Sequence, residues 1–412
     1  MKKVVGLAAA GLLAVSAANA GQITVANTDI TLFGGVSASY NVQNNDHALR
    51  STGTVLIRTN AQPWSGKDSF SVNNVIVGLT KPAQDGGIGF TAAFGSWQAP
   101  TVVASSDVVN DKKGNGNNPL VGYGKTTDFK PWLAFVTYKP VAGLSLDAGL
   151  LWTNFGERPV TILNPHITRG VLFTANPVLL TGARGTYDAG VAKVYVGAGK
   201  AGNYQLMGPV YTGLNNYSNY IEAGITSNLK QFGLPVDVGL HTYNENGNRD
   251  IYALTVGGDL GIVSLGLEVD YFKADDGLKK AWNNVTGLST SSNAWGAALC
   301  ANVKPVAGVQ VPVRIEYADN KDTILIPAIA AASLVAPQNA GTTAYFAPKK
   351  VWTFTITPTY NPTKNTFLRA EVSYAKASGN AFNGTSGYLF VNDKGEAKTS
   401  RTTGAVELGF LF

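Results

Sequence analysis

Few residues in this chain could carry nucleophilic or metal chemistry. It has three histidines, His47, His166 and His241, and a single cysteine, Cys300. None of the histidines has the spacing to other residues that serine hydrolases or zinc sites require. One cysteine can form neither an intrachain disulfide nor a thiolate metal cluster. The sequence therefore predicts no catalytic residue, no metal site and no cofactor.

Electrostatic chemistry is concentrated in residues 153–177, which read TNFGERPVTILNPHITRGVLFTANP. This stretch is apolar and stiffened by prolines, and its ionisable groups are Glu157, Arg158, His166 and Arg169. Folded into a narrow passage, these side chains would screen passing solutes, because charge acts strongly where solvent screening is weak. Two arginines against one glutamate would favour anions. Alternatively, the stretch folds over a rim or onto a neighbouring subunit, with its charges paired structurally.

The elements around this stretch alternate apolar and polar residues, as β-strands with one apolar face do. Leu265 and Leu267, for example, face away from Glu268 and Asp270. Mid-strand positions of the apolar face carry almost no charge, which is expected if that face meets lipid and the other meets water. Candidate wall residues of the interior are Arg184, Lys193, Glu222, Glu268, Asp270, Arg314, Glu316, Arg369 and Glu371, with Asp147, Asp237 and Glu407. This wall is mainly acidic while the loops add positive charge, so it leaves ion preference undecided.

The alternation falls into about sixteen segments of roughly ten residues, the length of a tilted membrane strand. We expect strands at residues 29–42, 69–80, 87–97, 130–139, 143–152, 178–188, 191–199, 217–227, 235–245, 249–259, 262–273, 293–303, 307–318, 350–360, 365–376 and 402–412. Pro312 and Pro358 fall inside two of them, and we interpret them as bulges or as errors in the strand limits.

The connections alternate between short turns and long polar loops. Short ones, such as 188–190 and 260–261, carry the Gly, Pro or Asn that tight turns need. Long ones lie at 43–68, 98–129, 153–177, 200–216, 274–292, 319–349 and 377–401, and 246–248 is the one short connection in that series. This alternation predicts an all-β fold: a closed antiparallel transmembrane barrel of about 16 strands, with periplasmic turns and extracellular loops.

The beginning of the chain has the pattern of a secretory signal. Lys2 and Lys3 precede a short apolar run from Val4 to Ala14, and Ala18-Asn19-Ala20 has the A-x-A pattern of a cleavage site. We expect residues 1–20 to be removed and residues 21–412 to form one barrel domain. No later segment reaches the ~18 uninterrupted apolar residues of a spanning helix.

The chain stops on an alternating strand whose apolar members include Val406, Leu408, Phe410 and Phe412. An open apolar edge strand would recruit other chains, whereas a closed barrel pairs its last strand with its first. This ending resembles the last strand of bacterial outer-membrane barrels. The resemblance implies that Phe410 and Phe412 belong to the signal that the barrel-assembly machinery reads.

Composition and aromatic placement agree with a membrane barrel. Charged residues make up 14% of the chain and its net charge is +6, with no basic run interleaved with aromatics, so nucleic acid is not an expected partner. Aromatic residues on the lipid-facing side gather next to the long loops, as in the interfacial belts of barrels. They are Tyr40, Trp152, Tyr271, Trp295, Tyr317, Trp352 and Tyr374.

A family likeness runs through residues 70–200. Gly156-Glu157, Asn164, Arg169, Pro177 and Thr181-Gly182 follow one another as they do in the OmpL-like β-barrel porin family of bacterial outer membranes, which this region resembles. Many members of that family have Ser beside the arginine, whereas this chain has Gly170. The resemblance implies a passive pore and supplies no catalytic residue.

The sequence thus favours an outer-membrane porin, a water-filled channel for passive diffusion of ions and small hydrophilic solutes. Its expected partners are outer-membrane lipid, these solutes and the assembly machinery, with monomer and homotrimer both left open. A substrate-specific channel is the first alternative, and ligand block of conductance would identify it. A secreted, soluble β-rich binding module is the second, and its extraction without detergent would identify it. An outer-membrane enzyme would show hydrolase activity.

Overall fold

The computed structural model describes residues 23–24, 29–44, 48–52, 55–59, 68–98, 102, 125–154, 164–177, 179–201, 218–280, 292–321, 349–378, 390–391 and 397–412. The expected signal at 1–20 lies outside this part of the chain, as do Glu157 and Arg158. In the part described, no helix is long and apolar enough to cross a membrane.

Nearly all the regular structure is β. The strands of the first half are β1 Ile23–Thr24, β2 Thr31–Gln43, β3 Ala48–Thr52, β4 Val55–Thr59, β5 Asp68–Lys81, β6 Gly87–Gln98, β7 Lys125–Val141, β8 Leu144–Trp152, β9 Leu179–Asp188 and β10 Ala192–Lys200. The second half has β11 Asn219–Asn228, β12 Val236–Glu245, β13 Arg249–Asp259, β14 Val263–Ala274, β15 Asn293–Val306, β16 Val309–Asp319, β17 Lys350–Ile356, β18 Thr359–Tyr360, β19 Thr366–Ser378, β20 Phe390–Val391, β21 Ala397–Lys398 and β22 Ser400–Leu411. Two 3₁₀ turns, η1 Leu172–Thr174 and η2 Leu229–Phe232, join them.

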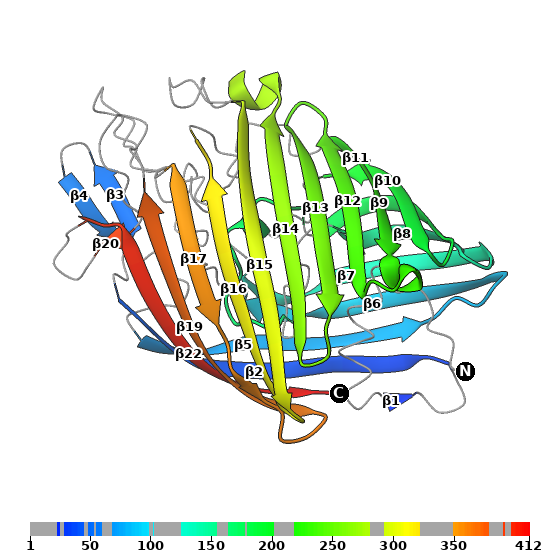
Figure 1. Cartoon of the computed structure of the whole chain (residues 1–412), viewed down its shortest axis with the longest axis horizontal. Helices are drawn as coiled ribbons and strands as arrows, with labels where there is room; N and C mark the ends of the chain where they lie inside the picture. Colours follow the sequence, from blue (N-terminus) through cyan, green and yellow to red (C-terminus); the bar gives the residue numbers. More distant parts are fainter. Residues whose placement is uncertain are drawn as a thin grey trace.

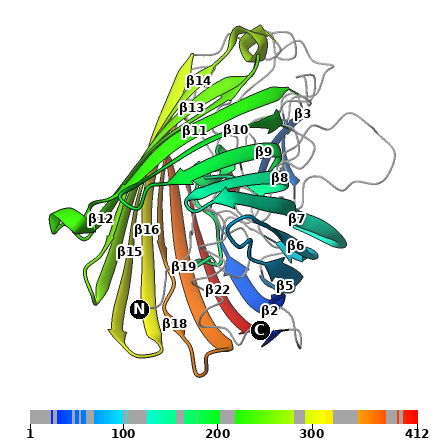
Figure 2. The same ribbon diagram turned by 90° about the vertical axis from the view of Figure 1, so that its right-hand side faces the viewer.

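The strands close into an antiparallel barrel of 16 wall positions among the described residues. From β5 to β16, each strand pairs with the next one in sequence. β17 and β18 together fill one wall position. β19 then pairs with β22, β22 pairs with β2, and β2 pairs with β5. In Figure 1, β12 to β17 cross the front of the molecule, while β2, β5 and β6 run behind at a steep angle to them. Figure 2 shows the wall continuing from β6 through β9 and β11 to β15. The fold class expected from the sequence is confirmed.

Phe412 takes part in the pairing that closes the barrel. Phe412 N donates to Gly34 O at 3.0 Å and Gly34 N donates to Phe412 O at 2.8 Å, which extends the β2–β22 ladder to the terminus. The Phe412 ring lies over Gly34, where an added Cβ would stand 2.6 Å from Cζ of the ring. Glycine at this position therefore lets the terminal ring seat against the first wall strand.

The two faces of the wall divide as the alternation predicts. Leu267 on β14 and Phe410 on β22 are 39% and 43% exposed, whereas Glu316 on β16 and Glu371 on β19 are 2% and 3% exposed. A barrel surrounded by lipid keeps apolar side chains outside and polar ones inside. The side on which each strand places its charges was therefore predictable from sequence parity.

Two of the short turns use the same local device. Gly190 and Gly261 have φ of 86° and 87°, a left-handed conformation that glycine adopts without steric cost. In each turn the carboxylate two residues earlier, Asp188 or Asp259, accepts the glycine N–H at 2.9 Å. This Asp-x-Gly turn fixes the reversal between β9 and β10 and between β13 and β14.

Proline accounts for the one broken wall strand in the described part of the barrel. β17 ends at Ile356 and β18 begins at Thr359, so Pro358 lies in the interruption. Proline lacks the N–H of a ladder hydrogen bond, and the regular pairing is interrupted at Pro358. Pro312 stays within β16 opposite Asn302, next to the irregular register between Val303 and Val306.

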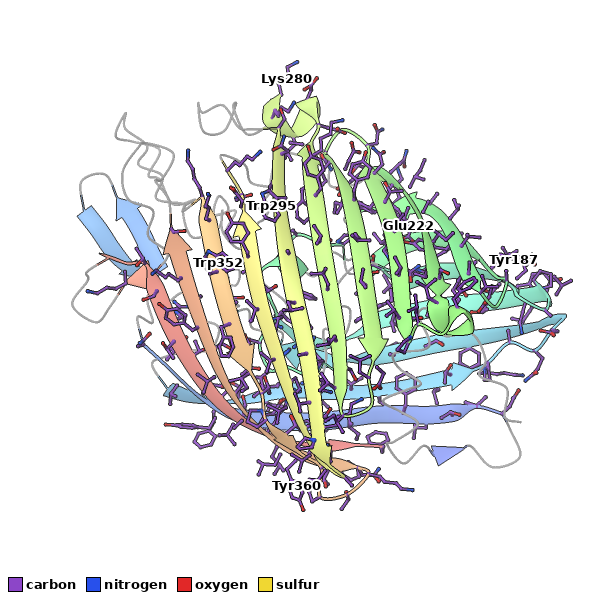
Figure 3. The ribbon with its side chains drawn as sticks, viewed as in Figure 1. Tyr187, Glu222, Lys280, Trp295, Trp352 and Tyr360 are labelled. Carbon is purple, nitrogen blue, oxygen red and sulfur yellow. The ribbon has the colours of Figure 1, made fainter. Side chains whose placement is uncertain are left out.

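The outer aromatics form a belt at the loop end of the barrel. Trp295, Tyr317 and Trp352 stand on three neighbouring strands with ring centroids 5.1 and 4.5 Å apart. Figure 3 shows Trp295 and Trp352 toward the loops, with Tyr187 and Tyr360 near the turns at the other end. The latter two are 51% and 52% exposed and form part of a second girdle that the sequence analysis missed.

The belt assignment is wrong for Trp152. Its side chain is 7% exposed and belongs to a buried cluster that includes Leu150, Leu179 and Phe173. Phe173 lies in the connection after β8 and belongs to the same buried cluster as Trp152. The other expected members are exposed or half-buried: Tyr40, Tyr271, Trp295, Tyr317, Trp352 and Tyr374.

Candidate functional site

The connection between β8 and β9 contacts the inner face of the barrel. We call its described part, residues 164–177, the inner segment. Apart from Pro165, every residue of it whose burial is described is buried. Side chains from β13, β14, β16 and β19 bind it, as does Thr357 between β17 and β18. Val102 of the β6–β7 connection donates its N–H to Arg169 O at 3.1 Å.

Glu371 of β19 binds the first part of the inner segment. Its Oε2 accepts the Ile167 N–H at 2.6 Å, and its Oε1 accepts the Thr168 N–H at 3.0 Å and the Thr168 hydroxyl at 2.6 Å. Thr357 and Ser373 donate to the same carboxylate at 2.8 and 3.2 Å. Because all of these donors surround a buried anion, the carboxylate is held in one orientation.

Glu316 of β16 binds the backbone in the same way further along the segment. It accepts the Val171 N–H at 3.0 Å and the Leu172 N–H at 3.3 Å, and Thr353 donates to it at 2.7 Å. Gly170 lies directly against the carboxylate, where a Cβ would stand 2.0 Å from Oε1. The sequence analysis noted Gly170 only as a departure from the family pattern, and this contact supplies its physical reason.

The wall carboxylates bind backbone N–H groups of the segment, and arginines of the wall bind its backbone carbonyl groups. Both Nη atoms of Arg314 donate to Thr168 O at 3.1 Å. Arg369 Nη1 donates to Asn164 O at 2.5 Å, and Arg249 Nη1 donates to Ala175 O at 2.6 Å. Each arginine also pairs with a wall carboxylate: Arg314 with Glu316, Arg369 with Glu407, and Arg249 with Glu245.

Arg169 and His166, both expected in a constriction, lie inside this network. Each is 2% exposed. Arg169 Nη1 donates to His166 O at 2.6 Å, so the guanidinium binds the backbone of its own segment. The His166 ring nitrogen Nδ1 lies 2.7 Å from the Thr357 hydroxyl and 4.0 Å from a Glu371 oxygen.

Burial lowers the pKa of the His166 imidazole well below its usual value near 6.5. The positive charges of Arg314, Arg369 and Arg169 lower this pKa further. His166 is therefore neutral at pH 7, and its ring acts as a hydrogen-bonding group rather than as a fixed charge.

The inner segment also contacts the wall at β15 and on the side of β8 and β9. The Leu172 side chain lies over Gly296 of β15, where an added Cβ would be 2.3 Å from its Cδ2. Phe173, the next residue, packs in the buried cluster with Leu150 and Leu179 of β8 and β9. Adjacent residues thus meet β15 and the β8–β9 side, so the segment extends across the interior.

The remaining wall candidates lie on the inner face but mostly make contacts of their own. Arg184 pairs with Glu222 at 3.6 Å and donates to Trp152 O at 2.8 Å. Lys193 pairs with Asp188 at 3.5 Å near a turn. Glu222, Asp270, Arg184, Arg314, Glu316, Arg369 and Glu371 are at most 4% exposed, while Lys193 and Glu268 are partly exposed. Their burial was not apparent from parity alone.

Several residues that bind the inner segment were not singled out from the sequence. Arg249, Thr353 and Thr357 each contact the segment or a carboxylate that holds it, and Asn176, within the segment, donates to Asp270 of β14. The threonines alternate with apolar residues like any inward-facing strand position, so only their parity marked them. Arg249 begins its strand directly after the short connection 246–248, and that exceptional connection was the one available signal.

The closed barrel, its apolar exterior and its polar interior define a channel-forming protein of the outer membrane. The family model described as "Putative beta-barrel porin-2, OmpL-like" matches residues 29–412. The chain therefore belongs to this porin family and is a channel-forming porin located in the bacterial outer membrane. The family likeness expected from the sequence is confirmed.

Solved structures show the same fold at low identity. The chain is similar to the outer membrane channel DcaP of Acinetobacter baumannii, with 14% identity, a TM-score of 0.56, and coverage of 95% of this chain and 100% of that one. It is also similar to an anion-selective porin from Comamonas acidovorans, with 14% identity, a TM-score of 0.51, and coverage of 93% and 99%. OmpT of Vibrio cholerae gives 10% identity, a TM-score of 0.51, and coverage of 95% and 100%. None of the curated proteins compared with the chain matches it.

Proposed function

We propose that the inner segment forms the constriction of this porin and that ions and small hydrophilic solutes diffuse past it. The observation that carries the proposal is the binding of its backbone by Glu371, Glu316 and Arg314 from one side of the barrel. A connection held in this way across the interior reduces the cross-section open to solutes. The other reading, a loop folded over the rim or onto a neighbouring subunit, does not account for these contacts.

Releasing the segment tests this proposal. Replacing both Glu371 and Glu316 by Gln keeps the side-chain shape but removes the charge that binds four backbone N–H groups. We expect higher and noisier single-channel conductance in planar bilayers. Glu222→Gln is the matched control, because Glu222 is an interior carboxylate whose ion-pair partner is Arg184. Equal conductance in the double variant and the wild type would assign the constriction to other residues.

The anion preference expected from Arg158 and Arg169 is here proposed for Arg158 alone. Arg169 is buried and bound to backbone carbonyls, so its charge does not meet solutes directly. We propose that Arg158 carries any anion preference of this stretch. Arg158→Ala should then shift the reversal potential toward cations in a salt gradient, with Arg169→Ala shifting it less. Similarity to an anion-selective porin at 14% identity supports the fold and not this preference.

We further propose that the porin assembles as a homotrimer. One of the similar structures is described as the trimer form of OmpT, with 9% identity and a TM-score of 0.50. Native mass spectrometry of the detergent-solubilised protein tests the proposal, and a mass corresponding to a single chain in mild detergent would contradict it.

A further inference from the structure

Four exposed lysines follow one arc of the outer surface, on the loop side of the aromatic belt. They lie on β14, β17 and β19 and just after β16, and we call them the lysine row: Lys273, Lys321, Lys350 and Lys376. Lys321 reaches β15, because its Nζ donates to Asn293 Oδ1 at 2.5 Å. Asn293 in turn stands opposite Lys273 in the ladder. The next strands, β13, β12 and β11, contain no lysine, so the row ends at β14 on that side.

Trp352 of β17 lies between two of these lysines. Lys350 precedes it by two residues on the same face of the strand, and Lys376 of β19 stands opposite it in the ladder. The Trp352 side chain is 51% exposed and lies toward the loops (Figure 3). Toward the turns the same surface continues as large, exposed side chains: Ile315, Phe354, Val372 and Tyr374. The outer surface therefore changes along one strand from apolar side chains, through an indole, to two ammonium groups.

Carboxylates offset only part of this positive charge. Asp319 Oδ2 lies 3.9 Å from Lys350 Nζ, and Asp250 Oδ2 lies 3.5 Å from Lys273 Nζ. Four lysines and these two aspartates together carry a net charge of +2. Exposed ion pairs of this kind are weak, because water screens them. The lysine row can therefore still attract an anion from outside the protein.

The position of the row indicates which anion fits it. Long loops mark the extracellular side of an outer-membrane barrel, so lysines directly beyond the aromatic belt lie at the headgroup level of the outer leaflet. That leaflet is built on lipid A, a glycolipid with phosphate groups on its sugar head and several acyl chains. Basic side chains at this level bind anionic head groups, and acyl chains pack on apolar strands. A second copy of the chain fits less well, because it would have to bury the excess positive charge.

We propose that the lysine row binds the phosphorylated head of lipid A. Lys350 and Lys376 meet a phosphate from either side of Trp352, and Lys321 and Lys273 extend the same surface toward β14. The acyl chains cover the apolar outer residues of β16, β17 and β19. The site does not depend on the inner segment being the constriction, because it involves only outward-facing side chains.

Binding of purified lipid A by the full-length porin in detergent tests the proposal. Bound lipid is counted by native mass spectrometry during a titration. We expect Lys350→Gln combined with Lys376→Gln to weaken binding about 25-fold, since each lysine beside an anionic lipid surface contributes about fivefold in affinity. Asp319→Asn should strengthen binding, because it removes the carboxylate beside Lys350. Lys81→Gln combined with Lys304→Gln is the matched control, because both lysines are similarly exposed but lie near short turns at the other end of the barrel.

Two results would overturn the site. One is a double variant of Lys350 and Lys376 that binds lipid A as tightly as the wild type; if this variant also dissociates into single chains, the arc is a contact between subunits. The other is equal binding of intact and dephosphorylated lipid A by the wild type, which would mean that apolar contact alone holds the lipid. The gain expected for Asp319→Asn cannot arise from a folding defect. None of these readouts uses conductance, so the outcome is separate from the test of the constriction.

Discussion

Gly170 lies directly against a carboxylate of the wall. An added Cβ would stand 2.0 Å from an oxygen of Glu316, and that carboxylate cannot easily yield because Val171, Leu172 and Thr353 all donate to it. We therefore expect Gly170→Ala to displace the segment and to destabilise the barrel by about 1–3 kcal/mol, as overpacking does.

Chemical unfolding in detergent, with single-channel conductance as a second readout, measures the effect of Gly170→Ala. Gly185→Ala is the control, since its added Cβ would meet only Leu146 at an ordinary 3.4 Å. If the two variants lost the same stability, the close contact at Gly170 would not be the cause.

His166 makes the stability of the inner segment depend on pH. Its pKa is lowered in the folded protein, so the unfolded chain binds the proton more readily. Its contribution is complete above the unfolded value of about 6.5 and is lost as the pH falls toward the lower folded value. We expect unfolding between pH 7.5 and 5 to become easier in the wild type, and less so in His166→Gln. A variant with the same pH slope would assign that slope to other groups.

At the scale of a strand, one substitution tests which face meets lipid. Leu267 is 39% exposed at the middle of β14. Leu267→Arg would place a cation against hydrocarbon at a cost of about 2–4 kcal/mol near the midplane. Leu267→Phe keeps that face apolar and should assemble normally. Comparing heat-modifiable mobility of the two variants in native membranes checks this, and equal yields would contradict the lipid-facing assignment.

The strands were the most predictable elements, because each combines alternation with a turn signal. β13 runs from Arg249 to Asp259 as expected, and β9 and β10 differ from their expected limits by one residue. β7 extends five residues before its expected start at residue 130, where Pro131 conceals the pattern. The contacts of the inner segment were not predictable, because Ile167 and Glu371 are 204 positions apart and no local pattern couples them.

At the scale of the whole molecule, the terminal ring bears on closure. Phe412→Ala keeps the two backbone bonds to Gly34 but removes the ring that covers it. We expect slower assembly and less folded barrel in the outer membrane, measured by heat-modifiable mobility. Phe232→Ala is the control, because that ring is 68% exposed at a short turn. Equal loss in both variants would show that the effect is not specific to closure.

Pairing of β2 with β22 could be expected because the chain ends on an alternating strand. The binding of the inner segment by the interior wall could not be expected from the sequence. Parity placed acidic and basic residues on the inner wall, but only the fold shows that Glu316, Arg314 and Arg369 bind a peptide segment. A sequence pattern records which way a side chain points and says nothing of what occupies the space in front of it.

The wall recognises the inner segment through its peptide groups. Glu371 and Glu316 bind N–H groups and Arg314 binds a carbonyl, features that nearly every amino acid shares. Proline at residues 167, 168, 171 or 172 would remove a donor, and bulk is limited where the segment packs tightly. The side chains of Thr168, His166 and Asn176 add wall contacts of their own, and the rest of the anchorage uses groups that any residue except proline supplies. Related porins could therefore exchange the side chains of this connection, and with them their solute preference, while inheriting an unchanged frame to hold it.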